Sequence, residues 1–141
     1  MSSASTICIT DFGCSTIKGA SLAFPSSDVD SGTIRWTAPE ILLSDKGKPS
    51  YKGDIHSLGM TILEVLTGSI PYSDTNEAEA LSRVTQGRVP ERPLEQVPKG
   101  SKQADAIWLL LVQNCWALEP KDRISAVDLH YQIKAIHEGG E

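Results

Sequence analysis

Positive charge is scarce in this 141-residue chain, in which 13 lysines and arginines face 18 acidic residues and give a formal net charge of -5. Such a composition provides no basic field for nucleic acid or for an acidic lipid surface, so we expect neither as a partner. Long apolar runs are also absent, because the longest uninterrupted one, residues 106–112, is far too short to cross a bilayer. The sequence therefore argues against nucleic-acid-binding and membrane-spanning classes.

Cysteine is rare as well, and Cys8, Cys14 and Cys115 are scattered without forming a CxxC pair. Three thiols cannot all pair in disulfides within one chain, which favours a reducing environment. Residues 1–6 lack the basic and apolar regions of a secretory signal peptide. These features together predict an intracellular, cytoplasmic location.

The stretch GDIHSLGMTILEVLTG, residues 53–68, is predicted to form the central helix of one domain. Asp54 is a suitable N-cap and Gly68 a suitable residue just past the helix end, and about four helical turns fit between them. The apolar residues cover more than one stripe, which predicts a helix that is buried on most of its faces. These residues are Ile55, Leu58, Ile62, Leu63, Val65 and Leu66.

Three other segments have the caps and the apolar spacing of helices, namely about 73–86, 102–116 and 125–136. Ser73 or Asp74 is expected to cap the first of them, and Ser125 the last. The predicted inward-facing residues are Ala78, Leu81 and Val84 in the first helix and Ile107, Leu110, Leu111 and Cys115 in the second.

The remaining segments are predicted to be extended or irregular. Residues 5–9 are rich in β-branched side chains and indicate a short strand. Residues 14–32 and 44–52 read as loops, and three prolines exclude a helix from residues 89–99. The expected fold class is mainly α, with one or two short strands near the N-terminus.

Four motifs follow one another along the chain. Asp11-Phe12-Gly13 comes after the predicted strand, and a carboxylate suits Mg²⁺, a hard ion that prefers oxygen ligands. GTIRWTAPE occupies residues 32–40, DIHSLG residues 54–59 and CWALEPKDRIS residues 115–125. In this order and spacing they resemble the protein kinase domain, specifically its C-terminal lobe from the Asp-Phe-Gly motif onward, in the tyrosine-kinase-like and Ser/Thr kinase groups.

The resemblance implies a role for each matching residue. Asp11 would bind Mg²⁺, and Asp11, Phe12 and Gly13 would lie at the ATP site. Thr33 would belong to the platform that receives the protein substrate. Glu40 would form a buried ion pair with Arg123, and Asp54 would accept hydrogen bonds from backbone N–H groups of the catalytic loop.

The resemblance also divides the chain into a partial kinase domain, residues 1–137, and a tail, residues 138–141. Within the domain, residues 1–13 would hold the strand and the metal ligand, 14–40 the activation segment and 41–137 a helical subdomain. Ser27 and Ser31 are candidate phosphorylation sites, although serines in a surface loop also serve as plain linkers. His56 stands where the family usually has Trp or Tyr, and we expect it to be a hydrogen-bonded core histidine.

Several parts of a kinase domain are not found in the sequence: the Gly-rich loop, the strand with the ATP-binding lysine and the His-Arg-Asp catalytic loop. We therefore expect the chain alone to bind no ATP tightly and to transfer no phosphate. The helices missing before the catalytic loop would also leave apolar residues of the central helix uncovered. An alternative reading is a non-catalytic interaction module that binds a partner kinase or a substrate through the activation-segment platform. Whether Ser/Thr or Tyr would be modified stays open, with a lean to Ser/Thr.

Overall fold

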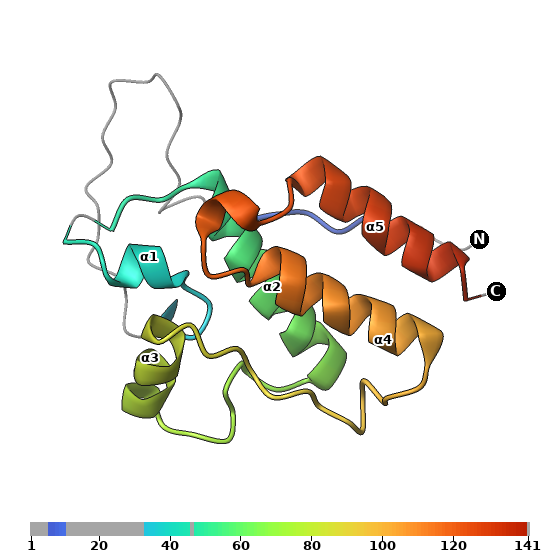
Figure 1. The fold of residues 1–141 in the computed structure, drawn as a ribbon, viewed down its shortest axis with the longest axis horizontal. Coiled ribbons are helices and arrows are strands. Elements are labelled where there is room, and N and C mark those ends of the chain that lie inside the picture. The colour runs from blue at the N-terminus through green and yellow to red at the C-terminus, as the bar shows by residue number, and fades with distance from the viewer. Residues whose placement is uncertain (1–5, 11–32, 46, 141) are drawn as a thin grey trace.

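A computed structural model describes residues 6–10, 33–45 and 47–140, and the described part is helical (Figure 1). The long helix α2 passes through the middle of the molecule, with α4 and α5 beside one another on one side and the short helices α1 and α3 on the other. The α-helices are α1 (Pro39–Leu42), α2 (Tyr51–Thr67), α3 (Glu77–Thr85), α4 (Lys102–Leu109) and α5 (Ala126–Glu138). The mainly helical fold class is confirmed.

Helix α2 is the predicted central helix, but it begins earlier than expected. Ser50, in an extended conformation, is its N-cap, and its Oγ accepts a hydrogen bond from the backbone N of Gly53 at 3.0 Å. The prediction of Asp54 as the cap was wrong, because the serine three residues before Gly53 already satisfies a free N–H group of the first turn. The C-terminal prediction is confirmed, since Gly68 adopts the left-handed conformation with φ of 69°.

The burial of α2 is one-sided. Ile55, Met60 and Leu63 belong to the hydrophobic core, whereas Leu58 and Leu66 are 43% and 40% exposed and Val65 is 79% exposed. The prediction of a helix buried on most faces was therefore wrong for the described residues. The expectation that part of its apolar surface would lack cover is met by Leu58 and Leu66 but not by Ile55.

The segment predicted as helix 102–116 is helical throughout but changes its winding. Helix α4 passes directly into a π-helix, Leu110–Cys115, and Leu110, Leu111 and Cys115 are buried as expected. The indole rings of Trp108 and Trp116 pack edge to face with 5.8 Å between their centroids. Burial raises the pKa of the Cys115 thiol to about 11, so this sulfur stays protonated within the core.

Helix α3 is shorter than predicted and buries a different face. Asn76 caps it, accepting a hydrogen bond from the backbone N of Glu79 at 2.9 Å, in place of Ser73 or Asp74. Val84 is buried as expected, but Ala80 takes the other core position, while Ala78 and Leu81 are exposed. The face that meets the core therefore runs through Ala80 and Val84, four residues apart, and not through Ala78 and Leu81.

Two further predictions concern the C-terminal and N-terminal segments. Ser125 caps α5 as expected, accepting from the backbone N of Asp128 at 3.1 Å, and the helix continues two residues past the predicted end to Glu138. The strand expected at residues 5–9 is not formed by residues 6–10, where Ile7 and Ile9 are 97% and 84% exposed. A strand needs a neighbour for its backbone groups, and the described residues provide none.

Gly59 marks the closest approach between α2 and the π-helix. A Cβ atom at this position would lie 2.7 Å from Nε1 of Trp116 and 2.8 Å from Cβ of Cys115. Glycine is therefore required here to let the indole lie against the helix backbone.

We predict that Gly59→Ala lowers the free energy of unfolding by about 1–2 kcal/mol, because overpacking costs more than alanine gains in helix propensity. Gly53→Ala in the same helix is the matched control. Its Cβ would lie 2.6 Å from Cδ1 of Ile41 and 3.2 Å from Oγ of Ser50, but Cδ1 is the far end of a flexible side chain that can move aside, unlike the Trp116 ring and Cys115 Cβ. Urea denaturation of both variants measures the difference. A Gly59→Ala protein at least as stable as the wild type would contradict the expected clash.

Candidate functional site

Residues 33–40, called the platform segment below, precede and open helix α1. The segment begins with a tight turn, in which the carbonyl of Thr33 accepts hydrogen bonds from the backbone N of Trp36 at 3.0 Å and of Thr37 at 3.2 Å. Thr37 Oγ1 donates to the same carbonyl at 2.9 Å. Pro39 then starts α1, where its fixed φ is compatible with the first helical turn and its missing N–H costs nothing. Thr33 itself is exposed at the surface.

Arg35 joins the platform segment to the loop between α2 and α3. Its Nη1 donates to the carbonyls of Pro71 at 3.1 Å and Tyr72 at 2.6 Å, and its Nη2 donates to Thr75 O at 2.9 Å. Tyr72 is buried and has a φ of 55°, a conformation that is rare for a residue with a side chain. The guanidinium thus donates hydrogen bonds to several carbonyl groups of a strained turn, and these bonds hold the platform segment against that turn.

Trp36 joins the platform segment to α2 through both its side chain and its backbone. Its Nε1 donates to Oε2 of Glu64 at 3.0 Å, and its carbonyl accepts a hydrogen bond from Ser57 Oγ at 2.9 Å. His56 Nδ1 lies 3.2 Å from the same carbonyl. His56 is 4% exposed, and the expectation of a hydrogen-bonded core histidine is confirmed.

The charge state of His56 follows from these surroundings. Burial lowers its pKa to about 4, and the positive charge of Arg123 acts in the same direction. The hydrogen bond to the Trp36 carbonyl and the charge of Glu40 oppose this shift without cancelling it. The imidazole is therefore neutral near pH 7.

Glu40, at the end of the platform segment, forms a two-pronged ion pair with Arg123. Nη1 of Arg123 lies 2.7 Å from Oε1 of Glu40, and Nη2 lies 2.8 Å from Oε2. The Arg123 side chain is fully buried, and it also donates to the carbonyls of Ala117 and Lys52, each at 2.9 Å. Partial burial raises the pKa of Glu40, but the hydrogen bonds and positive charge of Arg123 outweigh this, so the net shift is downward.

Of the other residues expected at the site, the structure describes only Asp54. Asp54 lies on the first turn of α2 at the surface, and partial burial of its carboxyl raises its pKa. Asp11, Phe12, Gly13, Ser27 and Ser31 lie outside the described residues. Within the described ranges, no cluster of three or more His, Cys, Asp or Glu side chains could hold a metal ion.

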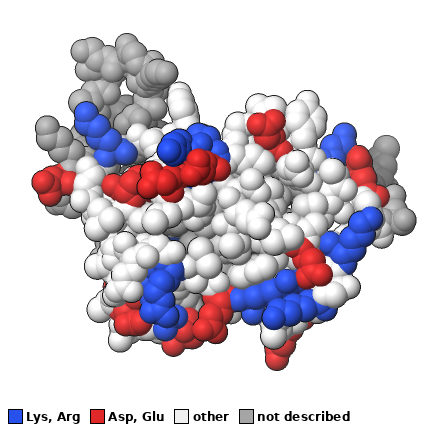
Figure 2. Space-filling view, viewed as in Figure 1, with Lys and Arg blue, Asp and Glu red and all other residues white. Residues whose placement is uncertain are grey.

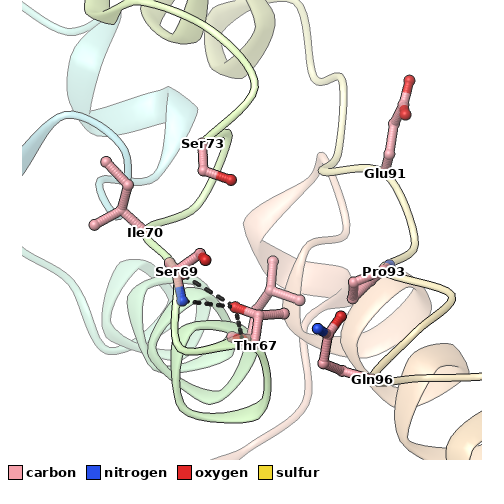
Figure 3. Close-up of a pocket in the computed structure, with 8 residues that line it drawn as sticks. Thr67, Ser69, Ile70, Ser73, Glu91, Pro93 and Gln96 are labelled. Carbon is pink, nitrogen blue, oxygen red and sulfur yellow. Dashed lines mark hydrogen bonds between the residues drawn. The ribbon is translucent and has the colours of Figure 1, made fainter.

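The surface gives little further guidance to a ligand. Figure 2 shows acidic and basic side chains interspersed around the visible face, with a white area between them. A cavity of about 180 Å³ lies at the end of α2, and Figure 3 shows Thr67, Ser69 and Gln96 around it. Thr67 Oγ1 is already bonded to the carbonyls of Leu63 and Ser69 and to the N of Ser69, so this corner is a structural turn. No helix in the described part has the length and apolarity needed to span a membrane.

Ser57 and Glu64 contact the platform segment, and neither contact was predicted from the sequence. Both project from α2 and are seven residues apart, which is close to two helical turns and places them on one face. The spacing could have shown that the two side chains share one face of the helix. It could not have shown that the carbonyl and the indole of Trp36 would contact that face.

Comparison with known proteins points to one family. The family model of the protein kinase domain matches residues 1–132. Mitogen-activated protein kinase kinase kinase 9 of Arabidopsis thaliana is 35% identical over 128 residues, which is 88% of this chain and 15% of that protein. Receptor-interacting serine/threonine-protein kinase 3 of Rattus norvegicus is 35% identical over 139 residues, covering 92% of this chain and 27% of that protein.

Guanylate cyclase 2D of Rattus norvegicus is 33% identical over 138 residues, which is 93% of this chain and 12% of that protein. The chain thus corresponds to only a part of each of these relatives. The family match over residues 1–132 and the identity of these relatives lead to one conclusion: the chain belongs to the protein kinase domain family.

Proposed function

We propose that the platform segment holds the protein substrate of an ATP-dependent protein kinase. The observation that carries the proposal is the anchoring of this segment to three separate parts of the helical core: Arg35 to the turn at 71–75, Trp36 to α2 and Glu40 to Arg123. A surface that receives a flexible peptide must itself be fixed, because holding reactants in register supplies much of the rate of a transfer reaction.

The chemistry of the family assigns complementary work to other residues. Protein kinases use ATP and Mg²⁺, which neutralises charge on the transferred phosphoryl group. In this proposal Asp11 is a ligand of that ion, Phe12 and Gly13 are its neighbours at the ATP site, and Asp54 accepts backbone N–H groups of a catalytic loop. We further propose Ser or Thr as the phosphate acceptor, as in the relative named a serine/threonine-protein kinase.

A polypeptide of residues 1–141 alone is proposed to transfer no phosphate. The sequence contains no Gly-rich loop, ATP-binding lysine strand or His-Arg-Asp loop, and phosphoryl transfer depends on these parts acting together with Asp11. A single carboxylate would bind Mg·ATP weakly, since Mg²⁺ keeps several waters when few protein ligands are present.

A second candidate is a non-catalytic module that binds a kinase or a kinase substrate. Two observations favour it. The exposed Leu58, Val65 and Leu66 leave apolar surface on α2, and one relative is named a guanylate cyclase, so the domain also occurs in a protein that is not named a kinase.

A chimeric kinase tests the proposal and separates the two candidates. The part of the rat receptor-interacting kinase that precedes the matched segment would be joined to residues 1–141 and assayed with γ-labelled ATP on Ser, Thr and Tyr peptides. We expect phosphate transfer to Ser or Thr peptides, a loss of about 10²–10³-fold with Asp11→Ala, and a raised KM for peptide with Arg35→Ala.

The controls use the same material. Lys134→Ala changes a surface side chain of α5 that is 60% exposed and should leave every constant unchanged. Residues 1–141 alone should give background transfer with and without Asp11→Ala. A chimera that binds ATP but phosphorylates none of the peptides would contradict the kinase proposal and favour the interaction module.

A further inference from the structure

The carbonyl of Trp36 lies near two neighbouring side chains of α2, Ser57 and His56. The Ser57 hydroxyl also has a second acceptor within reach, whereas His56 Nδ1 faces this carbonyl. Ser57 Oγ lies 2.9 Å from Trp36 O but also 3.2 Å from Gly53 O, and a hydroxyl has a single hydrogen to share between these acceptors. His56 Nδ1 lies 3.2 Å from Trp36 O. A carbonyl cannot donate, so this contact is a hydrogen bond only when Nδ1 carries the proton.

The surroundings of the imidazole favour this neutral form over the cation. His56 lines a small cavity, with a volume of about 10 Å³, together with Trp116. Trp116, which lines the same cavity, has a buried Nε1 donor without a hydrogen-bond partner in the described part of the chain, and protonation of His56 would add a further buried donor at Nε2. The charged and titratable groups around His56 are Glu40 of α1, Arg123, and Tyr72 and Arg88 of the cavity wall.

We infer that His56 is a positioning residue: as a neutral imidazole protonated at Nδ1, it holds the Trp36 carbonyl and thereby keeps the platform segment docked on α2. Protonation of Nε2 would add a second cation beside the buried Arg123, but Nδ1 would keep its hydrogen and its hydrogen bond to the Trp36 carbonyl. The inference rests on the proposed function only in treating this segment as the substrate platform. The docking itself is a property of the folded chain.

NMR spectroscopy of the full 141-residue chain labelled with ¹⁵N tests the inference. Long-range proton–nitrogen correlations report which ring nitrogen of His56 carries the hydrogen, and we expect Nδ1. The indole N–H of Trp36, which donates to Glu64 at 3.0 Å, reports docking of the segment, while those of Trp108 and Trp116 report the core. His56→Phe removes the donor, and we expect a displaced Trp36 indole signal and about tenfold faster amide exchange at Trp36.

His56→Gln is the matched variant, because its amide can donate to the carbonyl but does not titrate. It should keep the Trp36 indole signal in place at pH 7, where His56→Phe displaces it. Glu64→Gln in both backgrounds removes the contribution of the Glu64 carboxyl to this signal. If His56→Phe does not fold, the position of the hydrogen on the wild-type ring and the Trp36 indole signal of His56→Gln still decide the matter.

A neutral His56 that carries its hydrogen on Nε2, an unmoved Trp36 indole in folded His56→Phe, or a displaced Trp36 indole in folded His56→Gln would overturn the inference. None of these measurements involves a substrate. Loss of peptide phosphorylation by the chimera with a docked Trp36 would count against the platform function alone and would leave the role of His56 intact.

Discussion

Replacement of Arg123 by alanine is expected to lower the free energy of unfolding by about 3–5 kcal/mol, because it leaves the Glu40 carboxylate without its partner and vacates a fully buried site. Arg123 also satisfies backbone carbonyls of Ala117 and Lys52, which would lose a charged donor at the same time. The residue connects α1, the start of α2 and the segment before α5, so its loss should loosen all three.

Urea denaturation followed by circular dichroism measures this loss. Arg123→Lys keeps the charge but not the planar fork, and it should recover only part of the stability. Glu40→Gln leaves Arg123 buried without a counter-charge and should cost a similar amount, with a double-mutant cycle giving the coupling. The matched control is the surface pair Lys134–Glu138, whose side chains are 60% and 63% exposed, and where Lys134→Ala should cost less than about 0.5 kcal/mol. Equal effects at the two pairs would contradict the structural role given to Arg123.

Acidification from pH 7 to pH 4 is expected to remove about 3 kcal/mol of stability through His56 alone. The pKa of His56 is lowered from 6.5 to about 4 in the folded chain, so between these values the unfolded chain binds more protons than the folded one. Stability therefore rises with pH across this window, and it falls as the pH drops from 6.5 towards 4.

The measurement is the stability gap between wild type and His56→Gln at pH 7, 5.5 and 4. Carboxyl groups such as Glu40 and Asp54 titrate in both proteins and cancel in the difference. From pH 7 to pH 4 the free energy of unfolding of the wild type should fall by about 3 kcal/mol more than that of His56→Gln, mostly below pH 6. A gap that stays constant with pH would mean that His56 titrates in the folded chain as it does in the unfolded one.

The helices could be predicted from local sequence to the extent that their caps and apolar spacing are local properties. Gly68 and Ser125 act at helix ends as predicted, because a left-handed residue and an N-cap hydroxyl need only their own neighbours. Asp54 and the start of α3 were misplaced for a related reason. Two or three polar residues near each start can cap, and local pattern does not rank them.

The pairing of Glu40 with Arg123 was expected from the family resemblance, since nothing in composition or spacing links two residues 83 positions apart. The contacts of Arg35 with the turn at 71–75 could not be foreseen at all. They depend on the direction of backbone carbonyls, and that direction follows from the left-handed conformation of Tyr72.

The sequence by itself determined that the chain is mainly helical, where its central and last helices lie, and that it resembles a protein kinase domain from the Asp-Phe-Gly motif onward. Only the tertiary structure decided which side of α2 is buried and that Ser57, His56 and Glu64 hold Trp36. The physical reason is that helix caps and apolar spacing depend on residues within one segment. Burial and long-range hydrogen bonds depend on which other segment packs against it and supplies the partner.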